Sequence, residues 1–155
     1  METQASPSTP KKQVPIEEGL FYQPASKKEK PYLIGSKCSL CGNVTFPKKP
    51  VCPRCAKKDT MTVVHLSGRG KLDTFSIVNA ALPGFKAPSI QAYVQLEEGP
   101  RIWSLITGVE PNEKALKIGM DVELIVEKIK EDAQGNEVIS YQFRPVKESS
   151  GRRTP

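Results

Sequence analysis

Residues 37–58, "KCSLCGNVTFPKKPVCPRCAKK", contain all four cysteines of the 155-residue chain. The cysteines follow the spacing C-x2-C-x10-C-x2-C and are Cys38, Cys41, Cys52 and Cys55. Each Cys-x-x-Cys turn presents two sulfurs to one ion, and zinc prefers four thiolates in a tetrahedron. The ten-residue connector is long enough for a short hairpin that brings the two turns together. The segment therefore predicts a zinc ribbon, in which zinc is structural because four thiolates leave no open coordination position.

Other uses of four cysteines are weaker readings of the same segment. Rubredoxin-type iron takes the same four thiolates, so the spacing leaves zinc and iron both open. Two closely spaced pairs fit a disulfide framework poorly, because the N-terminus, "METQASPSTPKKQVP", has no apolar segment of a secretory signal. No run of about 18 apolar residues exists to cross a membrane. We therefore expect a cytoplasmic protein whose thiols stay reduced.

The positive charge is confined to the first part of the chain. Residues 1–60 hold eleven Lys/Arg and five Asp/Glu, for a net charge of +6, and residues 61–155 hold twelve of each, for a net charge of zero. An anionic partner should therefore meet the cysteine-containing end. The alternative is that the lysines only keep a small module soluble.

The second half of the chain has the pattern of a small β-barrel. Five segments alternate or are rich in β-branched and aromatic residues, and turn residues separate them: 68–82, 90–99, 101–108, 120–130 and 138–146. A short helical element is expected at 110–119, where a proline comes early and Gly119 closes the segment. This is the element order of an OB-fold barrel, although other five-stranded barrels fit almost as well.

The pattern divides the chain into four parts. We expect a mainly β protein with a flexible N-terminal extension at 1–30, a zinc ribbon at 31–66, an OB-fold barrel at 67–147 and a flexible tail at 148–155. Within the extension, the cluster Leu20–Tyr22 is expected to form one or two helical turns. Pro24 argues against a longer helix.

No complete active site is visible in the sequence. The metal site uses every cysteine, and the single histidine, His65, fits a surface or linker position better than a general base. No phosphate loop, HExxH or GxSxG motif is present. The chain alone is therefore expected not to be an enzyme.

One alternative is a module that binds single-stranded nucleic acid through a zinc ribbon and an OB-fold. Against it, the barrel segment is neutral. Its aromatic residues are expected in the core rather than on a stacking surface, and they are Phe75, Tyr93, Trp103, Tyr141 and Phe143.

The combination of several motifs resembles a known family. These are the CxxCG turn, "FPKKPVCPRC", "SGRGKLDTF", "IGMDVELIVE" and the closing "YQFRPV". Across residues 33–146 the chain is similar to the rubredoxin-like zinc-ribbon and OB-fold proteins associated with acyl-CoA enzymes. The N-terminal part of the chain departs from the family pattern. Only the cluster around Phe21 and Pro24 corresponds to the family's usual N-terminal helical arm.

The resemblance implies a non-catalytic accessory subunit in a hetero-oligomer with a thiolase-like catalytic subunit. The implied reaction is thiolytic cleavage of a 3-oxoacyl-CoA, such as benzoylsuccinyl-CoA in aromatic degradation. CoA carries several phosphates, which basic side chains can hold by charge-assisted hydrogen bonds. The candidate contacts to CoA or to the partner are Lys48, Lys49, Arg54, Arg69, Lys71, Phe85 and Lys86.

Overall fold

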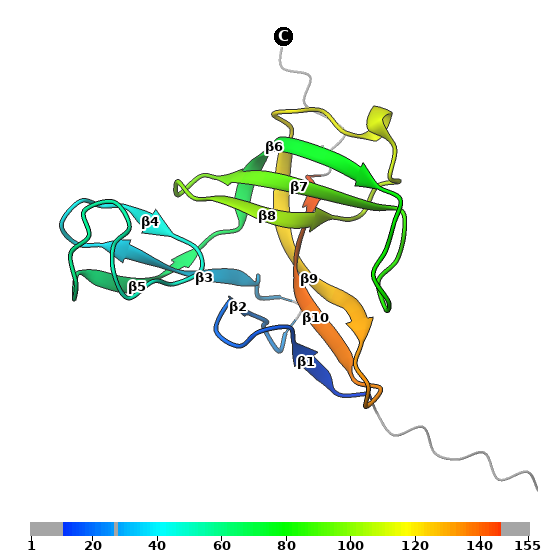
Figure 1. The fold of residues 1–155 in the computed structure, drawn as a ribbon, viewed down its shortest axis with the longest axis horizontal. Coiled ribbons are helices and arrows are strands. Elements are labelled where there is room, and N and C mark those ends of the chain that lie inside the picture. Colours follow the sequence, from blue (N-terminus) through cyan, green and yellow to red (C-terminus); the bar gives the residue numbers. More distant parts are fainter. Residues whose placement is uncertain (1–10, 27, 147–155) are drawn as a thin grey trace, which may run out of the picture.

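The computed structural model describes residues 11–26 and 28–146, which form two sheets of almost only β-strands (Figure 1). The strands are β1 (Gln13–Pro15), β2 (Phe21–Tyr22), β3 (Tyr32–Cys38), β4 (Val44–Thr45), β5 (Met61–Leu66), β6 (Arg69–Val78), β7 (Ser89–Leu96), β8 (Arg101–Ile106), β9 (Asp121–Glu131) and β10 (Glu137–Pro145). One turn of 3-10 helix, Glu113–Ala115, lies between β8 and β9, where the sequence predicts a helical element.

The smaller sheet forms the lobe that carries the cysteines. Strand β3 is at its centre and pairs antiparallel with β2 and β4 along one edge and with β5 along the other. The short β3–β4 hairpin leads from the first Cys-x-x-Cys turn toward the second. In Figure 1 this lobe projects to one side of the larger sheet.

The predicted five-stranded barrel makes up the larger sheet, to which β1 is added beside β10. Its strands follow the order β10-β8-β7-β6-β9, and β10 also pairs antiparallel with β9, which closes the sheet on itself. The closure is uneven, because β8 and β10 are paired at only one position, Phe143 with Ile106. The β9–β10 hairpin also extends well beyond the other strands (Figure 1).

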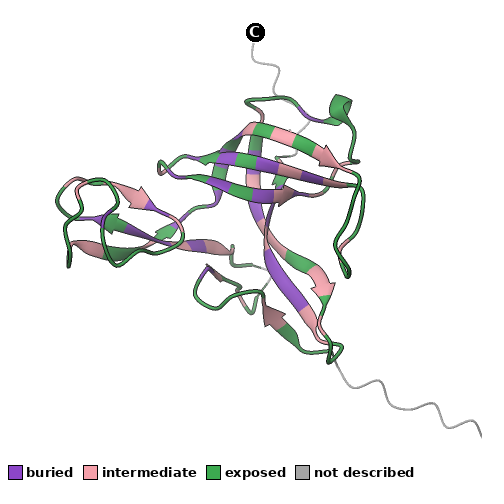
Figure 2. Cartoon of the chain, in the orientation of Figure 1, coloured by how far each residue is buried: buried purple, intermediate pink, exposed green. Residues whose placement is uncertain are grey.

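Alternation along the strands explains which residues enter the barrel. In β7 the side chains of Ile90, Ala92, Val94 and Leu96 are buried, and the intervening side chains face outward, as the sequence predicts (Figure 2). The buried cluster also includes Leu33 and Leu66 of the smaller sheet. The two lobes therefore share one continuous core.

The aromatic residues of the barrel only partly match the prediction that they are core residues. Phe143 is fully buried, but Trp103 and Tyr93 are 47% and 43% exposed. They form a cross-strand pair on the outer face of β7 and β8. The prediction was wrong for this pair, because both occupy the outward-facing positions of alternating strands whose inward positions hold smaller apolar residues.

Part of the N-terminal extension is folded onto the barrel. Gln13–Pro15 pair in parallel with Glu137–Ile139 of β10. The cluster around Phe21 forms strand β2 on the edge of β3, so the expected helical turns are wrong. Segments of three and two residues carry no periodicity of their own, and their structure comes from distant strands that offer unpaired backbone groups. Residues 1–10 of this extension and the tail 148–155 lie outside the described residues.

Two glycines fix the junction where β5 leads into β6. A Cβ atom at Gly68 would lie 2.3 Å from the Leu124 Cβ, and one at Gly70 would lie 2.5 Å from the Gln95 carbonyl oxygen. Gly68 also has a φ of +74°, a backbone conformation that residues with a Cβ atom rarely adopt. The "SGRG" sequence is thus required for close packing of this junction against β7 and β9.

We propose to divide the ribbon from the barrel between residues 66 and 67, because β5 pairs with β3 of the ribbon as far as Leu66.

The described part of the chain contains no helix with the length and apolarity needed to cross a membrane.

Candidate metal centre and its surroundings

The two Cys-x-x-Cys turns have the same backbone construction. The carbonyl of Cys38 accepts from the N–H of Gly42 at 2.9 Å, and the carbonyl of Cys52 accepts from the N–H of Ala56 at 2.9 Å. The residue after the second cysteine has positive φ in both turns, +74° at Gly42 and +58° at Ala56. Glycine adopts this left-handed conformation readily at Gly42, and Ala56 adopts it without being glycine.

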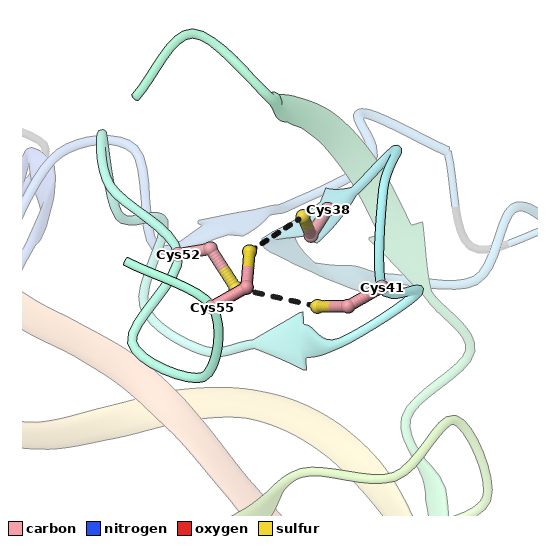
Figure 3. A group of neighbouring side chains, drawn as sticks. All are labelled: Cys38, Cys41, Cys52 and Cys55. Atoms are coloured by element: carbon pink, nitrogen blue, oxygen red, sulfur yellow. Dashed lines mark hydrogen bonds between the residues drawn. The ribbon is translucent and has the colours of Figure 1, made fainter. Parts of the chain in front are cut away.

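These turns bring the four sulfurs together, with Cys38 and Cys41 on one side of the cluster and Cys52 and Cys55 on the other (Figure 3). All four Sγ atoms lie within 4.8 Å of one another, with 3.7 Å between Cys38 and Cys55 and 3.5 Å between Cys41 and Cys52. A tetrahedron with zinc–sulfur bonds of about 2.3 Å has sulfurs about 3.8 Å apart. The donor set and its spacing therefore fit a four-thiolate zinc ion, as the sequence predicts.

The electrostatics of the cluster also call for a cation. The backbone N–H of Cys41 and the Thr60 hydroxyl lower the pKa of the Cys38 thiol to about 6. The backbone N–H of Asn43 lowers the pKa of Cys41, but burial and the sulfurs of the other cysteines outweigh it and raise that pKa to about 11. Four thiolates at this spacing repel one another, and a divalent cation removes that repulsion.

Aromatic contacts hold the ribbon against the barrel. Phe46, which follows β4, meets the Tyr141 ring edge-on at 5.4 Å, and Phe21 of β2 meets the same ring at 6.4 Å. Burial raises the pKa of the Tyr141 hydroxyl. The hydroxyl donates to the Trp103 carbonyl at 3.3 Å. Tyr141 therefore links the ribbon, the N-terminal segment and the barrel.

A carboxylate fixes the covalent connection between the two lobes. The hydroxyl and the backbone N–H of Ser67 donate to Glu98 Oε1, at 2.5 Å and 3.2 Å. The other oxygen of Glu98 is buried and has no hydrogen-bond partner within the described residues. Glu98 lies in the β7–β8 turn, so this turn restrains the point where the chain leaves the ribbon.

The structure does not bring the seven candidate contact residues into one site. Lys48 and Lys49 lie on the ribbon between β4 and the second cysteine turn, and Arg54 lies within that turn. Arg69 and Lys71 lie at the start of β6, where Lys71 pairs with Asp121 at 3.0 Å. Phe85 and Lys86 lie in the loop before β7.

The loop before β7 forms one side of a pocket at the end of the barrel. Lys86 and Pro88 line this pocket, which has a volume of about 380 Å³. Phe85 does not line it, because its ring packs under the Lys130 ammonium at 5.2 Å. Gln142 of β10 also lines it and was not among the predicted site residues. In the sequence, a polar residue between aromatic residues on a strand suggests a solvent-facing position. The burial of Gln142 could therefore not be predicted from the sequence.

His65 is placed on the exposed surface, as expected. It lies on β5 and stacks on Tyr32 at 4.1 Å, and Tyr32 in turn stacks on Tyr22 at 4.8 Å. The three rings form a ladder across the outer face of the smaller sheet. No hydrogen bond or ion pair joins the His65 side chain to another described residue, so nothing in this part of the chain orients it as a base.

The fold and the cluster together define a four-cysteine zinc ribbon joined to an OB-fold barrel. Two family profiles match the corresponding parts: "ChsH2, rubredoxin-like zinc ribbon domain" at residues 25–61 and "ChsH2, C-terminal OB-fold domain" at residues 63–127. The chain belongs to this family, as its sequence motifs indicate.

Relatives of the chain include a scaffold protein and a thiolase subunit. A "DUF35 domain-containing scaffold protein" of Methanothermobacter thermautotrophicus is 40% identical over 72% of this chain and 84% of its own length. "Benzoylsuccinyl-CoA thiolase subunit BbsA" of Thauera aromatica is 36% identical over 75% of this chain and 78% of its own length.

A solved structure extends the likeness to three dimensions. The "Ltp2-ChsH2(DUF35) aldolase" contains a chain that superposes with a TM-score of 0.60 at 27% identity. The match covers 74% of this chain and 84% of that chain. The ribbon-plus-barrel architecture is therefore shared with a chain of this aldolase structure.

Proposed function

We propose that this chain is a non-catalytic accessory subunit of an enzyme complex that acts on acyl-CoA substrates. The observation that carries the proposal is the membership of a family whose named relatives include a scaffold protein, a thiolase subunit and a component of an aldolase. Thiolases and aldolases both cleave a carbon–carbon bond activated by a carbonyl group. More specifically, we propose a thiolase-like partner in a cytoplasmic hetero-oligomer, with thiolytic cleavage of a 3-oxoacyl-CoA such as benzoylsuccinyl-CoA.

The cysteine chemistry of the chain supports a division of labour. A thiolase needs a nucleophilic cysteine that carries the acyl group and a base that activates it. All four cysteines of this chain converge on one cluster suited to a structural metal. The reactive thiol and its base therefore come from the partner subunit, and this chain contributes binding surface and stability.

The charge of the ribbon supports contact with an anionic surface or with CoA phosphates. Residues 37–58 contain six Lys/Arg and no Asp/Glu. Every ion pair of the described residues lies outside this segment, on the barrel or between Lys11, which precedes β1, and Glu131 of β9. Lys48, Lys49 and Arg54 are thus free to meet phosphates or acidic side chains.

Co-expression with a thiolase encoded beside this chain tests the proposal. We expect the two proteins to elute together in size exclusion, and we expect activity to require a cysteine of the partner. Triple replacement of Lys48, Lys49 and Arg54 by glutamine should weaken the complex or raise the KM for the CoA substrate. Thiolytic activity of this chain alone, or failure of the proteins to associate, would contradict the proposal.

One observation favours a second function, binding of single-stranded nucleic acid. Tyr93 and Trp103 are exposed on the outer face of the second and third barrel strands, where OB-folds bind oligonucleotides, and the Arg101 guanidinium lies 4.4 Å from the Tyr93 ring centroid. However, Arg101 is paired with Asp73 at 2.7 Å, which leaves this face without excess positive charge. Binding of an unlabelled oligonucleotide that quenches Trp103 fluorescence at physiological salt would support this function, and an unchanged spectrum would exclude it.

A further inference from the structure

One side-chain hydroxyl is in contact with the four-cysteine cluster. Thr60 Oγ1 lies 3.3 Å from Cys38 Sγ, and Thr60 is half-buried. In the described part of the chain, no other side-chain hydroxyl, amide or ammonium group forms a hydrogen bond with a cysteine sulfur. Thr60 follows the second Cys-x-x-Cys turn and directly precedes β5. The contact therefore distinguishes Cys38 from the other three cysteines.

Thr60 also connects the two cysteine turns. Its carbonyl accepts from the N–H of Ser39 in the first turn at 2.8 Å. Its hydroxyl lies 3.4 Å from the carbonyl of Lys57, which also accepts from the N–H of Cys52 in the second turn at 3.2 Å. The same residue thus links the two turns through protein groups and touches the cluster where a metal ion would link them.

The hydroxyl has one proton and two acceptors within reach. When Cys38 is a thiol, its S–H donates to Thr60 Oγ1 and the hydroxyl donates to the Lys57 carbonyl. A metal ligand is a thiolate, which has no proton and only accepts. A charged sulfur is a stronger acceptor than a neutral carbonyl, so the hydroxyl proton turns to Cys38. The Lys57 carbonyl keeps its bond from Cys52, so this turn leaves no acceptor unpaired.

Burial makes this hydrogen bond important for Cys38. Cys38 is only 1% exposed, so water cannot take the place of the hydroxyl at its sulfur. A buried charge without a hydrogen-bond donor is unfavourable. The pairing of Cys38 on β3 with Met61 on β5 holds the neighbouring Thr60 beside the sulfur. Strand register therefore places the hydroxyl before any metal is bound.

We infer that Thr60 is a positioning residue of the metal centre, whose hydroxyl donates to the Cys38 thiolate and fixes the orientation of that ligand. Groups that bond to metal ligands in this way orient them and raise metal affinity. The inference goes beyond the proposed function and does not depend on the partner subunit.

Zinc affinity of the full-length chain, measured by competition with a chromophoric chelator, is the first test. Thr60→Val replaces the hydroxyl by a methyl group of similar size and keeps the branched Cβ atom. We expect it to weaken zinc binding by about tenfold or more, because such outer partners typically contribute about 10–100-fold to metal affinity. Thr60→Ser keeps the hydroxyl and should restore most of the affinity.

Thr62→Val is the matched control. Thr62 lies two residues further along the chain, and its hydroxyl donates to the Lys37 carbonyl at 3.2 Å rather than to a sulfur. The same chemical change at Thr62 should leave zinc affinity unchanged. The amide of Ser39 reports on the local fold, because its bond to the Thr60 carbonyl is independent of the side chain. Its hydrogen exchange should be the same in every variant.

The reduction potential of the iron-substituted chain separates hydrogen bonding from packing. Four thiolates of this kind also hold iron, and hydrogen bonds to the sulfurs help to set its potential. A donor to a thiolate stabilises negative charge, and the reduced site carries one more negative charge than the oxidised site. We therefore expect a lower potential in Thr60→Val and recovery in Thr60→Ser, which a role in packing alone would not produce.

Unchanged zinc affinity in Thr60→Val overturns the inference, and so does an equal loss of affinity in Thr62→Val. Weaker zinc binding with an unchanged iron potential would show that the side chain only fills space, which also overturns it. If Thr60→Val takes up no metal, Thr60→Ala removes the same hydroxyl in a smaller side chain and is judged by the same outcomes. None of these measurements uses the partner, so their failure would leave the proposed function standing.

Discussion

The paired cysteine turns allow one backbone conformation to be tested in both directions. Gly42 and Ala56 occupy equivalent positions with φ values of +74° and +58°. We predict that Ala56→Gly tightens zinc binding and that Gly42→Ala weakens it. The residues differ by one methyl group, and both positions are exposed, so the changes in buried area are small.

The magnitude follows from the backbone alone. An L-residue in the left-handed region costs about 1–2 kcal/mol, while glycine loses about 0.4–1 kcal/mol more conformational entropy on folding than alanine. The free energy of folding of the ribbon should therefore become about 0.5–1 kcal/mol more favourable in Ala56→Gly and about 0.5–1 kcal/mol less favourable in Gly42→Ala. A Cβ atom at Gly42 would have no heavy atom within 4 Å, so no steric clash adds to this value. Folding of a small ribbon is coupled to metal binding, so we expect zinc affinity to change by about two- to fivefold.

Competition with a chromophoric chelator at constant pH measures the zinc affinity of each variant. Ala81→Gly is the matched control, because Ala81 is exposed, lies outside the ribbon and does not have positive φ. It should leave zinc affinity unchanged. Weaker zinc binding by Ala56→Gly, or tighter binding by Gly42→Ala, would refute the equivalence of the two turns.

Three further predictions follow from the metal site, the junction and the N-terminal strand. Cys52→Ala should lose zinc and unfold the ribbon, as measured by metal analysis and circular dichroism, and a folded metal-free variant would contradict a structural role. Gly68→Ala should destabilise the chain by about 2–4 kcal/mol in urea unfolding, since the added methyl meets Leu124 at positive φ; a loss below about 1 kcal/mol would show that the junction adapts. Hydrogen bonds from Lys11 and then Lys128 lower the pKa of Glu131 to about 2, so its stabilising effect is present above pH 4.5 and is lost as the pH falls toward 2. In Lys11→Gln, an NMR titration should show this pKa moving up toward 4.5, and an unchanged value would mean that Lys11 does not anchor β1.

The sequence alone determined the features that depend on local pattern. The spacing of Cys38, Cys41, Cys52 and Cys55 specified a four-thiolate site, because the chemistry of the ligands and the length of the connector leave few other arrangements. Alternating apolar residues located the five barrel strands, because successive side chains of a strand point to opposite faces and one face packs in the core. The sequence also showed directly that residues 1–60 carry the positive charge and that residues 61–155 have no net charge.

Only the tertiary structure decided features that depend on distant partners. Strands β1 and β2 are too short to have a periodicity, and they exist because β10 and β3 offer unpaired edges. The outward positions of Trp103 and Tyr93 depend on which strand face the barrel encloses. The burial of Gln142 depends on the gap between β8 and β10, a property of sheet closure that no single segment encodes. Long-range pairing thus set the surfaces of this protein, while local chemistry set its metal site.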